Sequence, residues 1–451
     1  MNFYDSMKYM DEVAKFGSIL GLKSITELLK RLDNPQDKLQ FVHIAGTNGK
    51  GSTAAYIANI MAVAGYKIGR YISPTIRCYC ERIQITNKTK ASQVETTYIS
   101  EEAVARHITR IADVCDEMSL DGYAHPTPFE IETAMGFLEF IDQGCDLVVL
   151  EVGMGGRLDA TNIIKNTKVA VLTSISMDHM QFLGDTLAKI AFEKAGIVKD
   201  NCKVVSYKQQ AEAMEVIESV CKEKDAELMI TDFDAMQNIR YGIEETVFDF
   251  SVEENVIINC SVLKNLKVHL LGKMQVKNAA VAVNTALMLK NIGYNVTEES
   301  IFIGLDITSW NGRFEKIHDN PTIILDGAHN EDAAYALVEA MELYFPKKEC
   351  IYVLGVLADK EYEKVLAITA KKAKSIYTIT PNNSRGLDAN SLAQCAMNYC
   401  SNVKATSSVN EALQLAIEES DKDNGYNEVT PIVVFGSLSF HEEVYSVLSK
   451  E

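Results

Sequence analysis

The chain has 451 residues, and 44 lysines and arginines against 62 aspartates and glutamates give it a net charge of −18. Its composition, 47% hydrophobic and 24% charged, is that of ordinary globular proteins, and its length predicts two or three domains. Binding to nucleic acid or to an anionic membrane requires a basic face. Because the chain is strongly acidic, we expect neither as a partner.

The amino-terminal residues contain acids and no long apolar run, which is unlike a signal peptide. No stretch approaches 18 uninterrupted apolar residues. The ten cysteines are scattered and form no CxxC pair, so reduced thiols explain them better than disulfides or a zinc site. We therefore expect a cytoplasmic, monomeric protein whose partners are small molecules.

Short apolar segments alternate with helical patterns along the whole chain. The apolar segments, each too short for a helix, are 39–45, 145–150, 168–172, 322–325, 351–354 and 431–435. Such segments are typical of strands that are buried on both faces of a parallel sheet. The helical patterns between them include 52–64, 274–292 and 330–343. The alternation predicts an α/β fold with mostly parallel sheets.

A polar, turn-prone stretch near 306–313 interrupts this alternation, which restarts after it. We therefore predict two domains, residues 1–308 and residues 309–451. Residues 232–267 alternate apolar and polar side chains, so we expect a small antiparallel sheet there, appended to the first domain.

The segment Gly46–Thr53, GTNGKGST, follows the first predicted strand and opens a helix, which is the position of a phosphate-binding loop. Glycines let backbone N–H groups approach phosphate oxygens, and Lys50 and the helix N-terminus add positive potential. The spacing departs from the general GxxxxGK[ST] pattern, because Gly51 separates Lys50 from Ser52 and the first glycine lies three residues before Gly49. A glycine-rich turn without a ligand is therefore an alternative for this segment alone.

Further polar clusters follow predicted strands, whose carboxyl ends form the ligand-binding edge of a parallel sheet. Glu151 ends the second apolar strand and opens EVGMGGRLDATN, and beside phosphates its carboxylate would hold Mg²⁺. His179 follows the next strand, ahead of Lys194 in EKAGI. In the second half, Asp326–Asn330 (DGAHN) follows another strand, and Arg313 precedes it in NGRFE. Taken singly, each is also explained as an ordinary polar residue at a strand end or helix cap.

Together these motifs resemble the folylpolyglutamate synthase/dihydrofolate synthase family, part of the Mur ligase superfamily. The five motifs occur in order, and the similarity runs from about Lys8 to the C-terminus. GTNGKGST is similar to the family's own version of the phosphate loop, which accounts for its spacing. The resemblance implies a P-loop-type, mostly parallel sheet domain with a small appended β-sheet, which binds ATP. It also implies a second, Rossmann-like α/β domain, which binds glutamate.

The resemblance also implies roles for individual residues. Those implied for ATP binding are Thr47, Asn48, Gly49, Lys50, Gly51, Ser52, Asn278, Arg313 and Asp326. Those implied for binding two Mg²⁺ ions are Ser73, Glu151, His179 and Lys194, the last as a carbamylated lysine. Those implied for the pterin are Leu20, Gly21, Leu22, Thr127, Pro128, Phe129, Glu130, Leu158, Asp159 and Ala160. Those implied for the incoming glutamate are Asp326, His329 and Ser437.

The reaction that the resemblance implies is ATP-dependent amide-bond formation. The γ-phosphoryl group of ATP passes to a carboxylate of dihydropteroate or of a reduced folate, and the α-amine of L-glutamate then attacks the acyl phosphate. Lys50 and Mg²⁺ would position and neutralise the phosphates, and Lys194 and His329 complete the expected catalytic set. His329 would either position the amine or accept its proton.

Three alternatives compete with this hypothesis. A Mur-type ligase would add an amino acid to a UDP-linked cell-wall precursor, but GGRLDATN and GRFE favour the folate branch. A nucleotide-dependent switch or transport NTPase explains neither EKAGI nor DGAHN. An inactive binding module is disfavoured because Lys50, Glu151 and His179 are all present.

Overall fold

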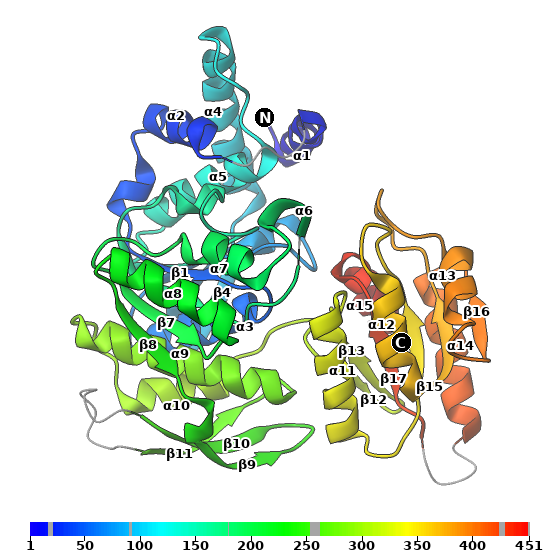
Figure 1. Ribbon diagram of the computed structural model, residues 1–451. Coiled ribbons are helices and arrows are strands. Elements are labelled where there is room, and N and C mark those ends of the chain that lie inside the picture. Colours follow the sequence, from blue (N-terminus) through cyan, green and yellow to red (C-terminus); the bar gives the residue numbers. More distant parts are fainter. Residues whose placement is uncertain (17–20, 90–92, 179, 253–261, 424–428, 450–451) are drawn as a thin grey trace. The chain divides into compact units, whose positions relative to one another are not determined.

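The structure is a computed structural model that describes residues 1–16, 21–89, 93–178, 180–252, 262–423 and 429–449 (Figure 1). The chain forms two compact units. The first comprises Met1–Ile239, Phe248–Lys267 and Lys277–Thr308. The second comprises Arg240–Val247, Val268–Val276 and Ser309–Glu451. Two short segments that precede residue 308 thus group with the second unit.

An eight-stranded sheet forms the centre of the first unit, in the order β4-β3-β2-β5-β1-β6-β7-β8. Its strands are β1 (Phe41–Ala45), β2 (Ile68–Tyr71), β3 (Ile83–Lys88), β4 (Val94–Tyr98), β5 (Leu147–Glu151), β6 (Thr167–Leu172), β7 (Lys203–Tyr207) and β8 (Glu227–Thr231). β3 pairs antiparallel with β2 and β4, and the remaining pairs are parallel. The strands predicted at 39–45, 145–150 and 168–172 are confirmed as β1, β5 and β6, with ends shifted by one or two residues.

Helices connect the strands of this sheet and pack against it (Figure 1). They are α1 (Phe3–Val13), α2 (Lys23–Arg31), α3 (Lys50–Val63), α4 (Glu101–Leu120), α5 (Pro128–Asp142), α6 (Met180–Leu183), α7 (Leu187–Ala195), α8 (Ala211–Glu223) and α10 (Glu298–Asp306), while α9 (Lys273–Asn291) begins in the second unit. α3 is buried from Ser52 to Val63, as expected for a helix that is apolar on all sides. It starts two residues earlier than predicted, so Lys50 lies in its first turn.

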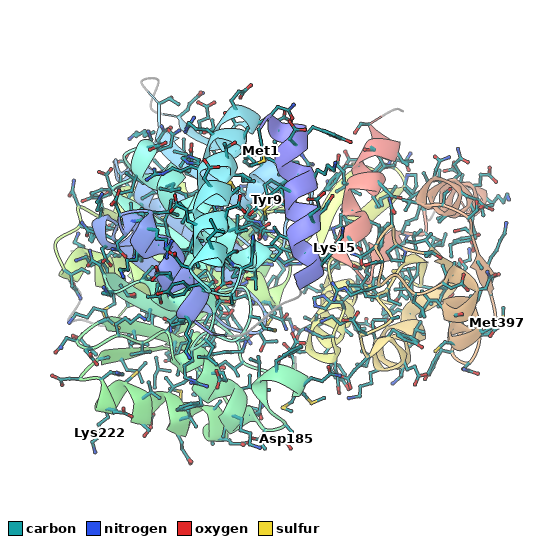
Figure 2. The ribbon with its side chains drawn as sticks, turned by 90° about the horizontal axis from the view of Figure 1, so that it is seen from above. Met1, Tyr9, Lys15, Asp185, Lys222 and Met397 are labelled. Carbon is teal, nitrogen blue, oxygen red and sulfur yellow. The ribbon has the colours of Figure 1, made fainter. Side chains whose placement is uncertain are left out.

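The amino-terminal helix is tied to the rest of the first unit by polar contacts. The terminal ammonium of Met1 donates to Thr109 Oγ1 on α4 at 2.9 Å, and Tyr9 Oη lies 3.3 Å from His125 Nε2. In Figure 2, Met1, Tyr9 and Lys15 mark the course of this helical segment.

No helix among the described residues is both long enough and apolar enough to cross a membrane.

A three-stranded sheet lies where the small appended sheet is predicted. Its strands are β9 (Met236–Tyr241), β10 (Thr246–Ser251) and β11 (Val262–Val268), in the order β11-β10-β9. β10 shows the expected period of two, because Thr246, Phe248 and Phe250 are buried and the residues between them are half-buried. Residues of this sheet are divided between the two units.

The second unit contains a six-stranded sheet in the order β12-β13-β17-β14-β15-β16, parallel except for β12. The strands are β12 (Glu315–Asp319), β13 (Thr322–Leu325), β14 (Cys350–Leu354), β15 (Ala373–Thr378), β16 (Val403–Ala405) and β17 (Ile432–Phe435). The helices are α11 (Glu331–Tyr344), α12 (Tyr362–Thr369), α13 (Ala389–Ala396), α14 (Val409–Asp423) and α15 (His441–Leu448).

Alternate residues of these strands pack into two separate cores. Tyr352 and Leu354 of β14 pack with α11, α12 and α13, whereas Ile351 and Val353 pack with α14 and α15. Helices therefore cover both faces of the sheet, which confirms the predicted Rossmann-like second domain.

Candidate active site

Four neighbouring strands of the first unit end at one edge of the sheet. Tyr71 of β2 lies beside Leu150 of β5, and Ile44 of β1 lies beside Glu151 of β5, all in parallel register. β1 in turn pairs in parallel with β6. Glu151 is the last residue of β5, and the segments that follow the other three strands carry Ser73, the glycine-rich loop and the residues before His179. The carboxyl edge of a parallel sheet is where ligands bind in folds of this type.

The glycine-rich loop needs glycine at position 49 for two physical reasons. Gly49 caps α3 with φ of +87°, a left-handed conformation that favours glycine. A Cβ atom at this position would also lie 2.5 Å from Oδ1 of Asn278 on α9. Tyr207, the last residue of β7, donates its hydroxyl hydrogen bond to the same Oδ1. The structure therefore brings Asn278, a predicted ATP contact, against the loop.

Two lysines converge on one carbonyl oxygen of this loop. Lys50 Nζ donates to the carbonyl oxygen of Gly46 at 3.0 Å and to that of Thr47 at 3.2 Å. Lys194 Nζ, whose residue is 4% exposed, donates to the Gly46 oxygen at 2.8 Å. Burial and the nearby charge of Lys50 lower the pKa of Lys194 to about 7, while Asp178 acts in the opposite direction. The Lys50 ammonium and the N-terminus of α3 make this an electropositive place, whereas the buried Lys194 amine is only partly charged near neutral pH.

The side chain of Thr47 holds the segment that follows β6. The Thr47 hydroxyl donates to the carbonyl oxygen of Ser176 at 3.0 Å and accepts from the Ser176 N–H at 3.1 Å. The Thr47 N–H donates to the carbonyl oxygen of Ser174 at 2.7 Å. His179 itself lies outside the described residues, so its predicted role as a metal ligand stays a prediction.

Oxygen donors suited to Mg²⁺ lie at the same edge of the sheet. Glu151 ends β5 and is 5% exposed. Ser73 is half-buried and lies two residues after Tyr71, which pairs with Leu150 near the end of β5. A carboxylate and a hydroxyl are hard ligands of the kind that Mg²⁺ takes together with phosphate oxygens. These residues therefore fit the ion that the sequence motifs imply.

Glu130, a predicted pterin residue near the start of α5, ties α5 to α2. Its Oε1 accepts from the Ile25 N–H on α2 at 3.0 Å. Its Oε2 accepts from the Thr127 N–H at 2.7 Å and from the Thr127 hydroxyl at 2.9 Å, which completes a capping box. Leu22, half-buried, immediately precedes α2, whereas Leu20 lies outside the described residues. Both carboxylate oxygens of Glu130 therefore bind the protein's own backbone.

Phe129 of the second pterin segment packs against Gly153, five residues before the third segment begins. A Cβ atom at Gly153 would lie 2.5 Å from the Phe129 ring, so the ring sits directly against that backbone. Asp159 is buried and binds its own segment, accepting from the N–H groups of Met154 at 2.9 Å and Thr161 at 3.0 Å. Burial raises the pKa of Asp159, and these hydrogen bonds oppose the rise. Leu158, Ala160 and Pro128 flank these residues in sequence.

The predicted glutamate residues gather within the second unit. Both oxygens of the buried Asp326 carboxylate accept backbone hydrogen bonds, from Phe314 at 2.7 Å and from Ala328 at 2.8 Å. Burial raises the pKa of Asp326, whereas the charge of Arg313 lowers it. His329 Nδ1 lies 2.7 Å from the carbonyl oxygen of Gly327.

Arg313 and the carboxyl-terminal loop border the same turn. A Cβ atom at Gly327 would lie 2.3 Å from Arg313 Nη1 and 2.5 Å from a methyl carbon of Leu438. Leu438 follows Ser437, whose hydroxyl lies 2.9 Å from that of Ser439. The turn after β13 therefore brings Arg313, Asp326, His329 and the Ser437 loop together.

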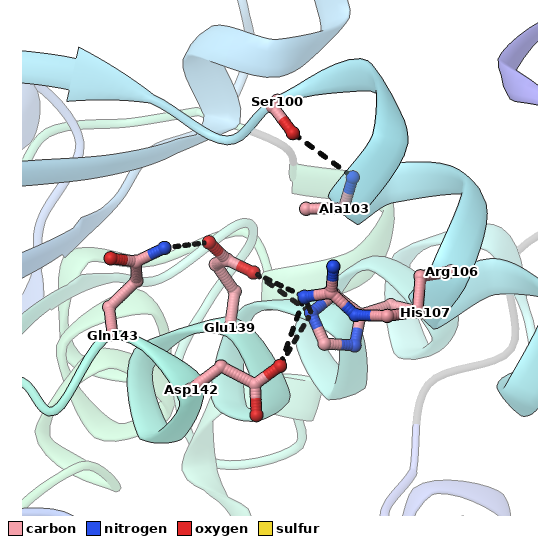
Figure 3. Close-up of polar contacts among 7 residues, drawn as sticks. All are labelled: Ser100, Ala103, Arg106, His107, Glu139, Asp142 and Gln143. Carbon is pink, nitrogen blue, oxygen red and sulfur yellow. Dashed lines mark hydrogen bonds and ion pairs between the residues drawn. The ribbon is translucent and has the colours of Figure 1, made fainter.

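A separate group of metal-ligating residue types lies between α4 and α5. The ligand atoms of His107, Glu139 and Asp142 lie within 4.8 Å of one another. The guanidinium of Arg106 already lies among them, 3.0 Å from Asp142 Oδ2 and 3.6 Å from Glu139 Oε2 (Figure 3). Because this guanidinium supplies the positive charge, the group is an ion-pair network that joins two helices.

The sequence motifs assign no role to two residues of the first unit's site. Asp178 is close enough to Lys194 to affect its pKa, and Tyr207 binds Asn278. Both follow or end a parallel strand, so the rule that located Glu151 would have found Tyr207 if applied to β7.

Comparisons with known proteins agree with this geometry. Residues 44–286 match the Mur ligase middle domain, and residues 312–438 match the Mur ligase, glutamate ligase domain. The first match spans more than half of the chain and contains the glycine-rich loop. The fold and the site therefore define a Mur-type, ATP-dependent ligase.

Relatives that match most or all of the chain show which family of this ligase class it belongs to. The chain is 31% identical to dihydrofolate synthase/folylpolyglutamate synthase of Bacillus subtilis, over 98% of each chain. It is 31% identical to folylpolyglutamate synthase of Lacticaseibacillus casei, over 86% of this chain and 87% of that one. The structure of Mycobacterium tuberculosis folylpolyglutamate synthase with ADP and AMPPCP superposes with a TM-score of 0.87, at 28% identity over 100% of both chains. The chain belongs to the folylpolyglutamate synthase/dihydrofolate synthase family, and the cell-wall alternative is not favoured.

Proposed function

We propose that the protein adds L-glutamate to dihydropteroate, to reduced folates, or to both, in an ATP-dependent reaction that passes through an acyl phosphate. The observation that carries this proposal is the glycine-rich loop at the carboxyl edge of the sheet, with Lys50, Lys194 and Asn278 gathered around it. A solved complex of a relative contains both AMPPCP and folate, with a TM-score of 0.82 at 27% identity, over 99% of this chain and 100% of that one.

The first unit would carry out phosphoryl transfer. The backbone N–H groups of residues 48–52 and the ammonium of Lys50 would hold the ATP phosphates, so that the γ-phosphoryl group lies in line with the acceptor carboxylate. Mg²⁺, held by Ser73, Glu151 and His179, would neutralise phosphate charge when bound. No protein nucleophile is required, because the substrate carboxylate itself attacks the γ-phosphorus.

The second unit would hold L-glutamate. Arg313 supplies a positive charge next to the buried Asp326, and His329 lies on the same turn with Ser437 near it. L-Glutamate carries one ammonium and two carboxylates, and this turn offers side chains of both signs of charge to bind them. His329 would orient the amine or accept the proton that it releases on attack.

Lys194 would serve as a carbamate that binds a second Mg²⁺. This assignment comes from the EKAGI motif, and the lowered pKa of the buried amine agrees with it. Electron density beyond Nζ, or a carbamate signal from ¹³C-bicarbonate that a Lys194→Gln variant lacks, tests it. A crystal with bare Nζ and both metal ions bound would contradict it.

One assay tests the proposed reaction: incorporation of labelled L-glutamate with ATP and Mg²⁺, using dihydropteroate and tetrahydrofolate in parallel. We expect incorporation with at least one of the two, and the pair decides which activities are present. Incorporation with neither acceptor, but with a UDP-linked acid, would assign the protein to cell-wall synthesis. ATP hydrolysis at full rate without glutamate would instead identify a nucleotide-dependent switch. A cytoplasmic location and a monomeric state remain predictions, which fractionation and light scattering test.

A further inference from the structure

We propose that a buried ion pair between Arg82 and Glu132 positions Ser73 for nucleotide and Mg²⁺ binding. Neither residue belongs to a motif of the sequence analysis. The inference rests on the proposed role of Ser73 as a ligand at the nucleotide site. Arg82 and Glu132 are positioning residues, since they act through the loop that carries Ser73.

Arg82 closes that loop, which runs from Ile72 to Arg82 between β2 and β3. The Ile72 N–H donates to the carbonyl oxygen of Arg82 at 3.0 Å. In return, Arg82 Nη1 donates to the carbonyl oxygen of Ile72 at 3.5 Å. Ser73 is the next residue after Ile72, so the closure defines where the Ser73 backbone leaves the sheet.

Glu132 of α5 forms an ion pair with the Arg82 guanidinium. Arg82 Nε lies 3.3 Å from Glu132 Oε1, and the two side chains are only 12% and 10% exposed. Burial raises the pKa of Glu132, and the charge of Arg82 opposes the rise. Because neither charge has much access to water, removing one partner leaves the other poorly solvated, and the loop has to rearrange.

Other contacts hold the same loop from inside and from its base. The buried Glu81 carboxylate accepts the Ile76 N–H, and Gln84 Nε2 donates to the Glu81 carbonyl oxygen at 2.7 Å. At the base, the Tyr71 hydroxyl lies 3.3 Å from Thr133 Oγ1, one residue beyond Glu132 on α5. The end of β2 and the end of the loop are therefore both attached to one turn of α5.

Attachment to α5 matters because a metal or phosphate ligand must be held close to its productive position. Loss of a residue that orients a metal ligand typically weakens metal affinity or activity about 10- to 100-fold. α5 is a rigid element capped by Thr127 and Glu130, so it provides a fixed reference for Ser73.

The chain offers a matched control on the same helix. Glu139 follows Glu132 by seven residues, about 10 Å along the helix axis. It too is a buried carboxylate paired with an arginine, Arg106, but it contacts α4 and not the loop (Figure 3). Glu132→Gln and Glu139→Gln therefore each remove one buried carboxylate from α5, and only the first affects the loop that carries Ser73.

The experiment measures binding of the non-hydrolysable analogue AMPPCP by calorimetry as Mg²⁺ is titrated, together with glutamate incorporation. For Glu132→Gln we expect the Mg²⁺ concentration that gives half-maximal AMPPCP binding to rise about tenfold. For Glu139→Gln we expect this concentration to stay within about twofold of the wild-type value. An unchanged Mg²⁺ dependence in Glu132→Gln would overturn the proposal. Equal shifts in both variants would overturn it as well, since they would indicate general destabilisation.

A second variant keeps the test decisive if Glu132→Gln does not fold. The double substitution Arg82→Met with Glu132→Met removes both buried charges and leaves no unpaired one. We expect it to fold and to show the same weakened Mg²⁺ dependence, whereas wild-type dependence would refute the positioning role. The two possible failures are distinguishable. Glutamate incorporation by the wild-type protein tests the proposed ligase reaction, whereas calorimetry needs no folate and tests this inference.

Discussion

The ammonium of Lys194 donates a 2.8 Å hydrogen bond to the carbonyl oxygen of Gly46, a residue 148 positions earlier in the chain. The two residues come from different motifs, EKAGI and GTNGKGST, and the sheet brings them together. Lys50 binds the same oxygen, so its positive charge lies at the loop before any nucleotide arrives. This arrangement suits a site that receives a triphosphate.

Replacement of Lys50 should remove phosphoryl transfer and leave the fold intact. We expect Lys50→Ala to lower glutamate-dependent ADP release by about 100-fold or more, because the side chain neutralises charge on the transferred group. Circular dichroism and thermal unfolding should remain close to those of the unchanged protein. Lys189→Ala is the control, since this exposed lysine of α7 pairs with Asp185. Wild-type turnover in Lys50→Ala would refute the assignment of the loop.

Replacing Gly49 tests whether ATP binding depends on the contact between the loop and Asn278 or only on the backbone strain at position 49. Gly49→Ala puts a Cβ atom at φ of +87° and against Asn278 Oδ1. Gly122→Ala is the matched control, because φ is +83° there and nothing lies within 4 Å of the new atom. Both should lose about 1 kcal/mol of stability from strain. Only Gly49→Ala should lose ATP affinity in calorimetry, and equal affinities in the two variants would contradict the role of the loop.

The ion-pair network of Figure 3 predicts a pH dependence of stability. Hydrogen bonds from His107 and Gln143 hold the pKa of Glu139 below its usual value despite burial, so its folded pKa lies below the unfolded one. Its stabilising contribution is therefore complete above the unfolded pKa, near 4.3, and is lost as pH falls through the lower folded pKa. Glu139→Gln should lower the free energy of unfolding by about 1–3 kcal/mol at pH 7.

Urea unfolding from pH 7 to pH 3.5 checks this sign. The difference between Glu139→Gln and the unchanged protein should shrink as the pH falls below about 4.3. Glu117→Gln, which changes a carboxylate that is 66% exposed, should differ little at any pH. A difference for Glu139→Gln that grows on acidification would contradict the direction of the pKa shift.

Asp326→Asn tests the turn of the second unit. Asparagine accepts one of the two backbone N–H groups and presents its own amide hydrogens to the other, while Arg313 loses an adjacent negative charge. We expect a loss of about 1–3 kcal/mol in thermal stability, together with a raised KM for L-glutamate. Asp359→Asn, at a half-exposed surface pair with Arg385, serves as the control. An unchanged KM for glutamate would remove Asp326 from the proposed glutamate site.

Much of the fold follows from local patterns in the chain. Strands such as Phe41–Ala45 and Leu147–Glu151 are short and mostly apolar; the first is followed by Gly46 and the second ends in an acid, a pattern typical of buried parallel strands that meet a binding loop. The motifs at their ends identify the family, because each one lies where a strand meets a loop. The start of α3 was misplaced by two residues, since the left-handed cap at Gly49 depends on the backbone and not on side-chain periodicity.

By itself, the sequence therefore determined six of the parallel strands, the α/β class of the fold and the polar residues at the ends of those strands. Only the tertiary structure decided which of those residues touch. The contacts of Gly46 with Lys194, of Gly49 with Asn278 and of Arg82 with Glu132 depend on the strand order and on how the helices pack across it. That order arises from long-range burial of apolar surface, which spacing along the chain does not encode.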